Sequence, residues 1–212
     1  MKKLYLVRHA ESEGNIGTVQ QGPSTPLSEK GTQQTAFIAE RFESIEIDSI
    51  LSSPQTRAKV TAEAIAAVVG KEIEYSDLLI ERKKPTAIIG MDRSNPEFDE
   101  IENSIRDNFH NLTWKYSDEE NFLDLKVRAV ELLQHAESLE GENILMVTHG
   151  VFMAMLAAYT IFGNELTSQE FWAVFVGTEH KNTGITILKQ SKFKDEPTRW
   201  KLLTWNDHAH LG

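Results

Sequence analysis

The chain has 212 residues, of which 40% are hydrophobic and 25% are charged, as in an ordinary globular protein. This length can bury a core of its own, so we expect a single domain over residues 1–212. The 22 basic and 32 acidic residues give a net charge of −10, which argues against a nucleic acid partner because phosphate backbones bind basic faces. The absence of cysteine excludes disulfides, thiolate nucleophiles and cysteine-type metal sites.

No targeting or membrane segment is expected from the sequence. The apolar run at 4–7 ends at once in Arg8-His9, which is too short for a signal peptide. The most apolar stretch, 151–162, is shorter than the about 20 residues that a membrane span needs. We therefore expect a cytoplasmic protein with no membrane contact.

The first part of the chain alternates apolar strands with amphipathic helices. Residues 11–28 are rich in Gly, Pro, Ser and Thr, which predicts a loop. Ser28 is typical of a helix N-cap, although Gly31 weakens the first turn, and Gly70 is typical of a C-cap. Strands are predicted over 3–7, 48–51 and 72–79, and helices over 29–42 and 55–69.

The middle of the chain differs in composition. Segment 82–120 is polar, broken by prolines and a glycine, and carries scattered aromatic residues. It predicts an insertion with one or two helices that shapes the mouth of a site and covers it as a lid. Further helices are predicted over 122–139 and 151–162, and strands over 143–147, 171–176, 184–189 and 199–205, the last at a sheet edge. The alternation predicts an α/β protein with a mostly parallel sheet and helices on both faces.

Four predicted strands run into residues that carry chemistry. These are Arg8-His9, Ser52-Ser53-Pro54 with Arg57 behind them, Glu81-Arg82, and Thr148-His149-Gly150. In open α/β sheets, ligands bind outside the carboxyl ends of the strands. The sequence therefore predicts a site at one edge of the sheet that contains two histidines, two arginines and a glutamate.

This set of side chains is suited to phosphoryl transfer. Arginine offers a fixed fork of donors that matches phosphate oxygens. A neutral histidine can attack phosphorus or act as a base, and a carboxyl group can protonate a leaving alkoxide. The sequence has neither a Walker A loop nor a G-x-S-x-G elbow, which excludes a P-loop enzyme and an ordinary α/β-hydrolase.

Three blocks of the sequence resemble a known family. LVRHAESEGN at 6–15, SSP at 52–54 followed by Arg57, and THG at 148–150 resemble, in the same order, the signatures of the histidine phosphatase superfamily. This superfamily includes the cofactor-dependent phosphoglycerate mutases. The resemblance implies a three-layer α/β/α sandwich that hydrolyses a phosphate monoester with neither a metal nor an organic cofactor.

The resemblance also implies roles for individual residues. His9 would be phosphorylated during turnover, and Glu81 would be the proton donor. Arg8, Arg57 and His149 would surround the transferred phosphate, with Asn15 and Gly150 as further contacts. The partner would be a small phosphorylated molecule or a phosphoprotein.

Two departures from the family pattern bear on the activity. Ala10 stands where glycine is commonest, and Glu81 is followed by Arg82-Lys83-Lys84-Pro85 instead of the stretch that holds the substrate carboxylate in mutases. The chain is also shorter than a typical mutase. These points favour a phosphatase, with a phosphoglycerate mutase or a weakly catalytic phospho-ligand binding module as alternatives.

Some of these residues also have plainer interpretations. Asn15 is next to Gly14 and close to Gly17, so it can equally be a turn former without a phosphate contact. Glu81 can form a surface ion pair with one of the basic residues that follow it. His208 and His210 form an H-x-H pair, for which we expect a polar terminal segment and no metal site.

Overall fold

A computed structural model of the chain describes residues 1–192, 194 and 197–212. Its centre is a six-stranded sheet with the order β3-β2-β4-β1-β5-β6. Strands β3, β2, β4 and β1 are parallel, whereas β5 pairs antiparallel with β1 and β6 pairs antiparallel with β5. The strands are β1 (Lys3–Arg8), β2 (Ser49–Ser52), β3 (Ile73–Tyr75), β4 (Asn143–Thr148), β5 (Ile185–Ser191) and β6 (Arg199–Asp207). The predicted mostly parallel sheet, with 199–205 in an edge strand, is confirmed.

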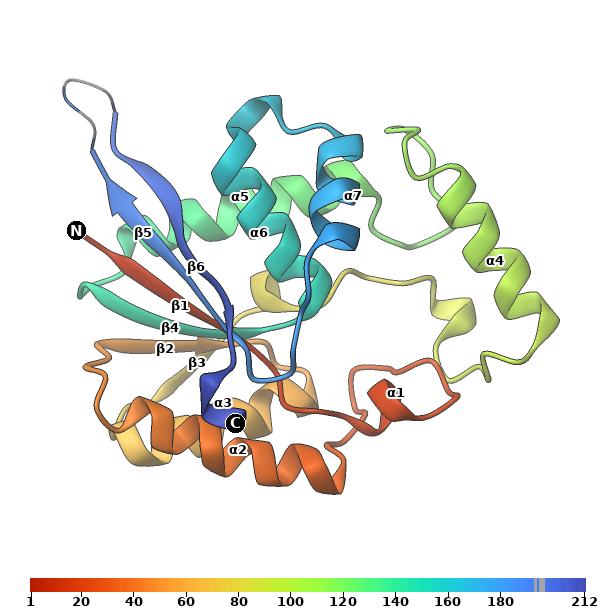
Figure 1. The fold of residues 1–212 in the computed structure, drawn as a ribbon. Helices are drawn as coiled ribbons and strands as arrows, with labels where there is room; N and C mark the ends of the chain where they lie inside the picture. Colours follow the sequence, from red (N-terminus) through yellow and green to blue (C-terminus); the bar gives the residue numbers. More distant parts are fainter. Residues whose placement is uncertain (193, 195–196) are drawn as a thin grey trace.

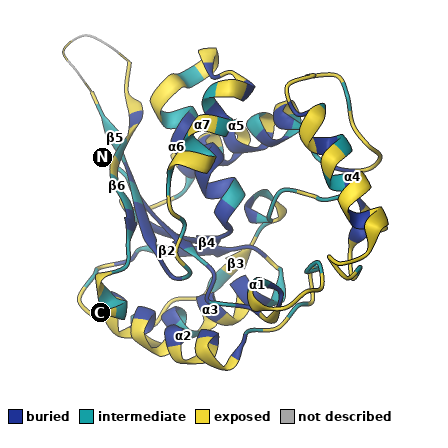
Figure 2. Cartoon of the chain, turned by 45° about the vertical axis from the view of Figure 1, so that its right-hand side comes forward, coloured by how far each residue is buried: buried dark blue, intermediate teal, exposed yellow. Residues whose placement is uncertain are grey.

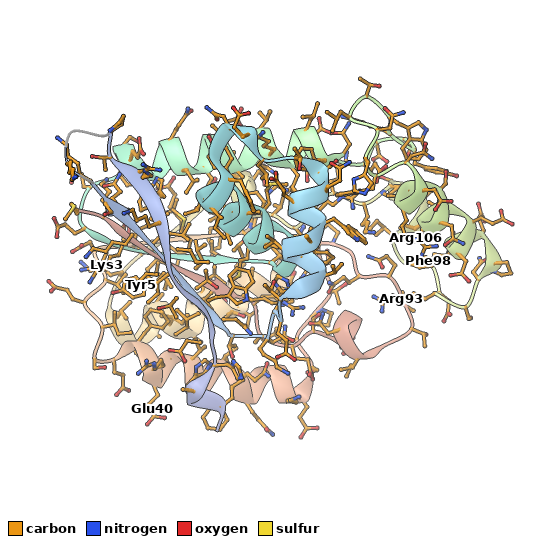
Figure 3. The ribbon with its side chains drawn as sticks, turned by 45° about the horizontal axis from the view of Figure 1, so that its top comes forward. Lys3, Tyr5, Glu40, Arg93, Phe98 and Arg106 are labelled. Carbon is orange, nitrogen blue, oxygen red and sulfur yellow. The ribbon has the colours of Figure 1, made fainter. Side chains whose placement is uncertain are left out.

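Helices cover both faces of this sheet, which confirms the three-layer architecture. In Figure 1, α2 and α3 lie on one face and α5 and α6 on the other, with α7 beside α6. The described residues form α1 (Glu13–Ile16), α2 (Glu29–Phe42), α3 (Thr56–Val69), α4 (Pro96–Asp107), α5 (Phe122–Ser138), α6 (Gly150–Phe162) and α7 (Ser168–Gly177). Figure 3 shows α4, with Phe98 and Arg106, on the opposite side of the molecule from Lys3 at the start of β1. The carboxyl end of β1 therefore points toward α4.

The two faces of β1 are buried in two separate cores. Leu4 and Leu6 pack in a cluster with α5 and α6, whereas Tyr5 and Val7 pack in a cluster with α2 and α3. Figure 2 shows the central strands of the sheet and the inner faces of these helices as buried. Each fully buried aliphatic side chain contributes about 1.5–3 kcal/mol. Burial on both faces explains why β1 reads as a continuous apolar run and not as an alternating one.

The predicted strand over 171–176 is wrong, because these residues belong to α7. Thr167 and Glu170 form a capping box, in which the Thr167 backbone N–H donates to Glu170 Oε2 at 2.8 Å and the Glu170 backbone N–H donates to Thr167 Oγ1 at 3.3 Å. Phe171 and Phe175, four residues apart, then pack against the same core cluster. The cap and the helical spacing of these rings override the β-propensity of an aromatic and β-branched run.

Two further predictions are corrected near the site. The strand predicted over 72–79 ends at Tyr75, because Ser76 accepts a hydrogen bond from the Leu78 backbone and starts a 3₁₀ turn at Asp77–Leu79. The loop predicted over 11–28 contains α1, which Ser12 and Asn15 cap. The other predicted strands and helices outside 82–120 are confirmed within two residues of their bounds.

Segment 82–120 holds one α-helix, α4, and its two ends are held together. Arg82 pairs with Glu119 at 3.0 Å, while the Glu120 backbone N–H donates to the Lys83 carbonyl oxygen at 3.0 Å. Near the middle of the segment, the Gln20 backbone N–H donates to the Met91 carbonyl oxygen at 2.9 Å. The segment therefore starts and ends at one place and touches the loop between β1 and α2. Its action as a lid stays a prediction.

Gly31 is required by a close approach between α2 and the loop before it. A Cβ at this position would lie 1.9 Å from the carbonyl oxygen of Glu11. We expect Gly31→Ala to lower the free energy of unfolding by about 1–3 kcal/mol, as overpacking does, measured by urea denaturation. Gly177→Ala at the end of α7 is the matched control, since a Cβ there meets nothing within 4 Å. Equal stability of the two variants would contradict this role of Gly31.

Candidate active site

Two histidines lie side by side at the carboxyl edge of the sheet because β1 and β4 are parallel neighbours. Their register pairs Arg8 with Thr148, so the next residues, His9 and His149, emerge at the same level. The centroids of the two imidazole rings are 5.0 Å apart. Their relative exposures are 1% for His9 and 0% for His149. A single strand pairing thus brings together two buried histidines that are far apart in the sequence.

The ring of His9 has one nitrogen fixed by the backbone and the other turned to Arg57. Nδ1 lies 2.7 Å from the carbonyl oxygen of Ala10, which can only accept, so Nδ1 carries the hydrogen. Nε2 therefore has the lone pair, and it accepts a hydrogen bond from Nε of Arg57 at 3.2 Å. This is the tautomer that a nucleophilic imidazole needs for attack by Nε2.

The protonation state of both imidazoles follows from their surroundings. Burial, followed by the charges of Arg57 and Arg8, lowers the pKa of His9 well below its ordinary value of 6.5. Burial, followed by His9 and the nearby arginines, lowers the pKa of His149 in the same way. Both rings are therefore neutral at pH 7, and His9 keeps its lone pair.

Arg57, in the first turn of α3, is a buried cation bonded only to neutral groups. It is 2% exposed, and its guanidinium donates to His9, to the Gly22 carbonyl oxygen at 3.0 Å and to the Gln55 side chain. Burial lowers its pKa to about 10, so it remains charged at pH 7. No carboxylate of the described residues lies within ion-pair distance of it. A buried charge without a partner favours an incoming anion.

Arg8, the last residue of β1, adds a second cation, which is partly buried. It donates to the carbonyl oxygen of His180, and its Nε is buried without a hydrogen-bond partner in the part of the chain that the structure describes. Burial lowers its pKa, while Glu81 acts in the opposite direction. Gly150 borders this guanidinium, since a Cβ there would lie 3.4 Å from Arg8 Nε. The unpaired Nε–H is available to a ligand oxygen.

His149 is held by a residue from the neighbouring strand end. It is the N-cap of α6, and its Nε2 lies 2.9 Å from Oγ of Ser53, which follows β2. Ser53 Oγ also accepts a hydrogen bond from the Gln55 backbone at 3.3 Å. The Nδ1 of His149 is buried and has no partner among the described residues. When Ser53 donates to Nε2, this second nitrogen carries the hydrogen and becomes a free donor.

The Glu81 carboxylate lies at the N-terminus of α6. It accepts hydrogen bonds from the backbone N–H of Val151 at 3.3 Å, Phe152 at 3.2 Å and Arg82 at 2.8 Å. The side chains of Arg82 and Lys84 form ion pairs with other acids, so the surface ion-pair interpretation of Glu81 does not hold. The helix end instead orients the carboxylate beside the strand ends.

Arg128 of α5 fixes the backbone around Glu81. Its guanidinium donates to the carbonyl oxygens of Leu78 at 3.0 Å, Ile80 at 2.8 Å and Glu81 at 3.4 Å. The same group makes two hydrogen bonds to the carboxylate of Glu120, at 2.7 and 2.6 Å. The segment that follows β3 is thereby held at a defined place next to the N-terminus of α6.

Asn15 is linked to His9 by Asn182, which comes from a loop far away in the sequence. Asn182 donates from Nδ2 to the His9 carbonyl oxygen at 2.9 Å and to Asn15 Oδ1 at 3.2 Å. The same Oδ1 also accepts from the backbone and the hydroxyl of Ser12, both at 3.0 Å. The phosphate contact expected of Asn15 stays a prediction, and only its Nδ2 can supply it.

A cavity of about 520 Å³ opens beside Arg57 and Glu81, which both line it. His9 is hydrogen-bonded to Arg57 but is not itself among the lining residues. Its other lining residues come from the loop before α2, the start of α3, segment 80–89 and α6. A small organic phosphate fits this volume.

Two features of the described residues bear on other classes of protein. No group of three or more His, Asp or Glu side chains is placed to hold a metal ion in this part of the chain, the His208 and His210 pair included. None of the described helices combines the length and apolar character required to cross a membrane.

Sequence reasoning missed three residues that orient the site. Ser53 was visible as part of a strand-end motif, but its bond to His149 depends on the order of β2 and β4. Arg128 lies between the apolar positions of α5, and nothing in the sequence distinguishes it from a surface arginine. Asn182 gave no signal, since its loop returns to His9 only through the antiparallel pairing of β5 with β1.

The buried neutral histidines make stability depend on pH. The unfolded chain binds a proton at each near pH 6.5, whereas the folded chain, whose pKa values are depressed, does not. The free energy of unfolding therefore falls as the pH drops below 6.5, with a slope approaching about 1.4 kcal/mol per pH unit for each histidine. Urea denaturation between about pH 5 and pH 7 should show a smaller slope for His149→Asn than for the native chain. An unchanged slope would contradict this assignment.

Comparison with known proteins agrees with this geometry. The sequence profile of the histidine phosphatase superfamily (branch 1) matches residues 4–208. GpmB of Salmonella arizonae, named a probable phosphoglycerate mutase, is 34% identical over 215 residues, which cover 100% of this chain and 95% of that protein.

Solved structures of similar fold cover the whole chain as well. YhfR of Bacillus stearothermophilus is 25% identical, with a TM-score of 0.83 and 100% of both chains covered. A mutant phosphoserine phosphatase of Entamoeba histolytica, in complex with phosphoserine, is also 25% identical, with a TM-score of 0.76 and 100% of both chains covered. The strand-end histidines and arginines and the profile match over nearly the full length lead to one conclusion: the chain belongs to the histidine phosphatase superfamily.

Proposed function

We propose that this protein is a phosphomonoesterase that works through a phosphohistidine on Nε2 of His9. One observation carries the proposal: a neutral, buried imidazole directs its Nε2 lone pair at Arg57, a buried cation that has no acid partner among the described residues. A phosphate group compensates that charge and brings phosphorus within reach of the imidazole. Membership of the superfamily and the phosphoserine phosphatase relative support the same chemistry.

The first step transfers the phosphoryl group to His9. The phosphate oxygens replace Nε2 as acceptors of the Arg57 Nε–H, which frees the lone pair. Nε2 forms a bond to phosphorus while the ester P–O bond breaks, and protonated Glu81 gives its proton to the departing oxygen. The products of this step are the alcohol, a phosphohistidine and an ionised Glu81.

The second step releases phosphate. The Glu81 carboxylate takes a proton from water, whose oxygen attacks phosphorus as the P–N bond breaks. Inorganic phosphate leaves, Nε2 of His9 regains its lone pair, and Glu81 is protonated for the next turnover. The one carboxyl group thus serves as acid and then as base.

Charge stabilisation falls to the groups around the phosphate. The unpaired Arg8 Nε–H, the Arg57 guanidinium and the Nδ1 hydrogen of His149 would hold the equatorial oxygens, with Asn15 and Gly150 as further contacts. Donors fixed in a water-poor site stabilise the transition state more than water does, because they need no reorganisation.

A phosphoglycerate mutase is the second candidate, because GpmB carries that name. A mutase returns the phosphoryl group of the phosphohistidine to an alcohol instead of to water. Interconversion of 3-phosphoglycerate and 2-phosphoglycerate in the presence of a bisphosphate primer separates it from release of inorganic phosphate. A mere phospho-ligand binding module would do neither.

The substrate and the cellular location are part of the same proposal. The cavity volume supports a small phosphorylated molecule, and a phosphoprotein could present a phosphorylated side chain to the same opening. A chain without cysteine and with a net charge of −10 suits the cytoplasm, and we propose that location.

His9→Ala tests the covalent mechanism. We expect the variant to lose several orders of magnitude in turnover of p-nitrophenyl phosphate, assayed without added metal, because the nucleophile is removed. Native protein quenched in turnover should carry an acid-labile phosphoryl group that the variant lacks. His135→Ala on α5 is the control, and circular dichroism checks the fold. Retention of more than about a tenth of native turnover by His9→Ala would contradict the mechanism.

Glu81→Gln tests the acid–base role. An alkyl alkoxide must be protonated as it leaves, so we expect hydrolysis of alkyl phosphates to slow by about 10²–10⁴-fold. With p-nitrophenyl phosphate the phenolate leaves readily, so phosphorylation of His9 should slow much less, and phosphoenzyme should accumulate. Rapid-quench kinetics measures both steps, with the exposed Glu72→Gln as control. Equal slowing of phosphorylation by both leaving groups would show that Glu81 only positions the substrate.

A further inference from the structure

The geometry points to an aromatic hollow beside Glu81 as the subsite for the leaving alcohol, and hence to an uncharged alcohol with an aromatic or apolar body as the substrate's organic part. This inference rests on the proposed phosphatase function and names its substrate class.

The hollow is walled by four rings from two parts of the chain. Phe109 follows α4, whereas Phe171, Trp172 and Phe175 belong to α7, and together they line a cavity of about 270 Å³. The Phe109 ring centroid lies 5.2 Å from that of Trp172, and the Trp172 centroid lies 6.0 Å from that of Phe175. Trp172 and Phe175 are only partly buried, so their faces are accessible to a ligand. Such a wall binds an aromatic or apolar group.

The hollow adjoins the reaction site on the side of Glu81. Its lining shares Arg82, Lys84 and Val151 with the larger cavity that Arg57 and Glu81 line. The Val151 backbone N–H donates to the Glu81 carboxylate at 3.3 Å. An alcohol whose oxygen is at Glu81 therefore has the hollow next to it.

The cations that follow Glu81 are already neutralised. Arg82 pairs with Glu119 at 3.0 Å, Lys83 with Asp118 at 3.2 Å, and Lys84 with Glu102 at 2.7 Å. Arg82 also lies over the Phe109 ring, 5.4 Å from its centroid. These side chains differ from Arg8 and Arg57, for which the described part of the chain supplies no acid partner. The mouth therefore offers no unpaired charge from this run to a second acid group on the substrate.

Arg106, a further cation that lines the hollow, does not supply a strong site for an acid group either. Arg106 is exposed on α4, and its guanidinium donates to the Asn103 side chain. An exposed charge is screened by water and contributes little to holding a carboxylate. The aromatic wall is thus the feature that selects the alcohol.

Substrate comparison is the direct test. We expect kcat/KM for 3-phenylpropyl phosphate to exceed that for n-propyl phosphate by about tenfold or more, because the ring leaves water for the aromatic wall. Both O-phosphoserine and 3-phosphoglycerate should be poorer substrates than 3-phenylpropyl phosphate. Trp172→Ala should reduce the phenylpropyl-to-propyl ratio about tenfold through KM, while Trp172→Phe keeps most of it. Thermal melting of both variants checks that the fold persists.

A charge substitution gives an independent gain-of-function test. Glu102→Gln removes the partner of Lys84, which lines both cavities. We expect kcat/KM for 3-phosphoglycerate, relative to that for 3-phenylpropyl phosphate, to rise about three- to tenfold. Glu100→Gln makes the same charge change at an exposed position of α4 and should leave the ratio as in the native protein.

The outcomes separate the two proposals. A higher kcat/KM for 3-phosphoglycerate or O-phosphoserine than for 3-phenylpropyl phosphate would overturn the substrate class while leaving the phosphatase function standing. An unchanged substrate ratio in both Trp172→Ala and Glu102→Gln would do the same. If no ester released inorganic phosphate, the proposed function and this inference would both fall.

Discussion

The parallel pairing of β1 with β4 is the constraint on which the site depends. It places His9 and His149 at the same level, and the His9 backbone N–H donates to the Thr148 carbonyl oxygen at 2.9 Å, which fixes the register up to the last residue. A slip of one residue would turn one imidazole to the opposite face of the sheet. The α3 residue Arg57 and the strand-end Ser53 reach this pair only because β2 is the other neighbour of β4.

The site combines a positive interior with a negative exterior. Arg57 is buried and Arg8 is partly buried, and neither has an acid partner among the described residues, although the chain as a whole carries a net charge of −10. A buried nitrogen without a hydrogen-bond partner lowers the stability of the folded chain. The unpartnered nitrogens of Arg8 and His149 are free to donate to a bound anion. The desolvation that makes these cations costly also keeps His9 neutral, so one environment prepares both the anion site and the nucleophile.

Much of this arrangement could be predicted from the sequence because strand ends are local features. Arg8, His9 and His149 directly follow apolar runs, and the topology of an α/β sheet gathers such positions at one edge. The bonds of Arg128 and Asn182 could not be predicted, since their partners are backbone carbonyls that meet them only in the folded chain. The prediction of a strand over 171–176 was wrong for a related reason. Its aromatic residues have β-propensity, but a capping box and packing against the core place them in a helix.

Because the two ends of segment 82–120 are joined, the positioning of Glu81 is independent of the residues that shape the substrate opening. Because Lys83 and Glu120 meet backbone to backbone and Arg128 holds Glu81 from α5, the residues between these anchors do not set the position of Glu81. In evolution, helix α4 can therefore change in length and Phe109 can be substituted without disturbing the residues at the strand ends. The strand ends can thus keep the same reaction while changes confined to this one segment alter which substrates are accepted.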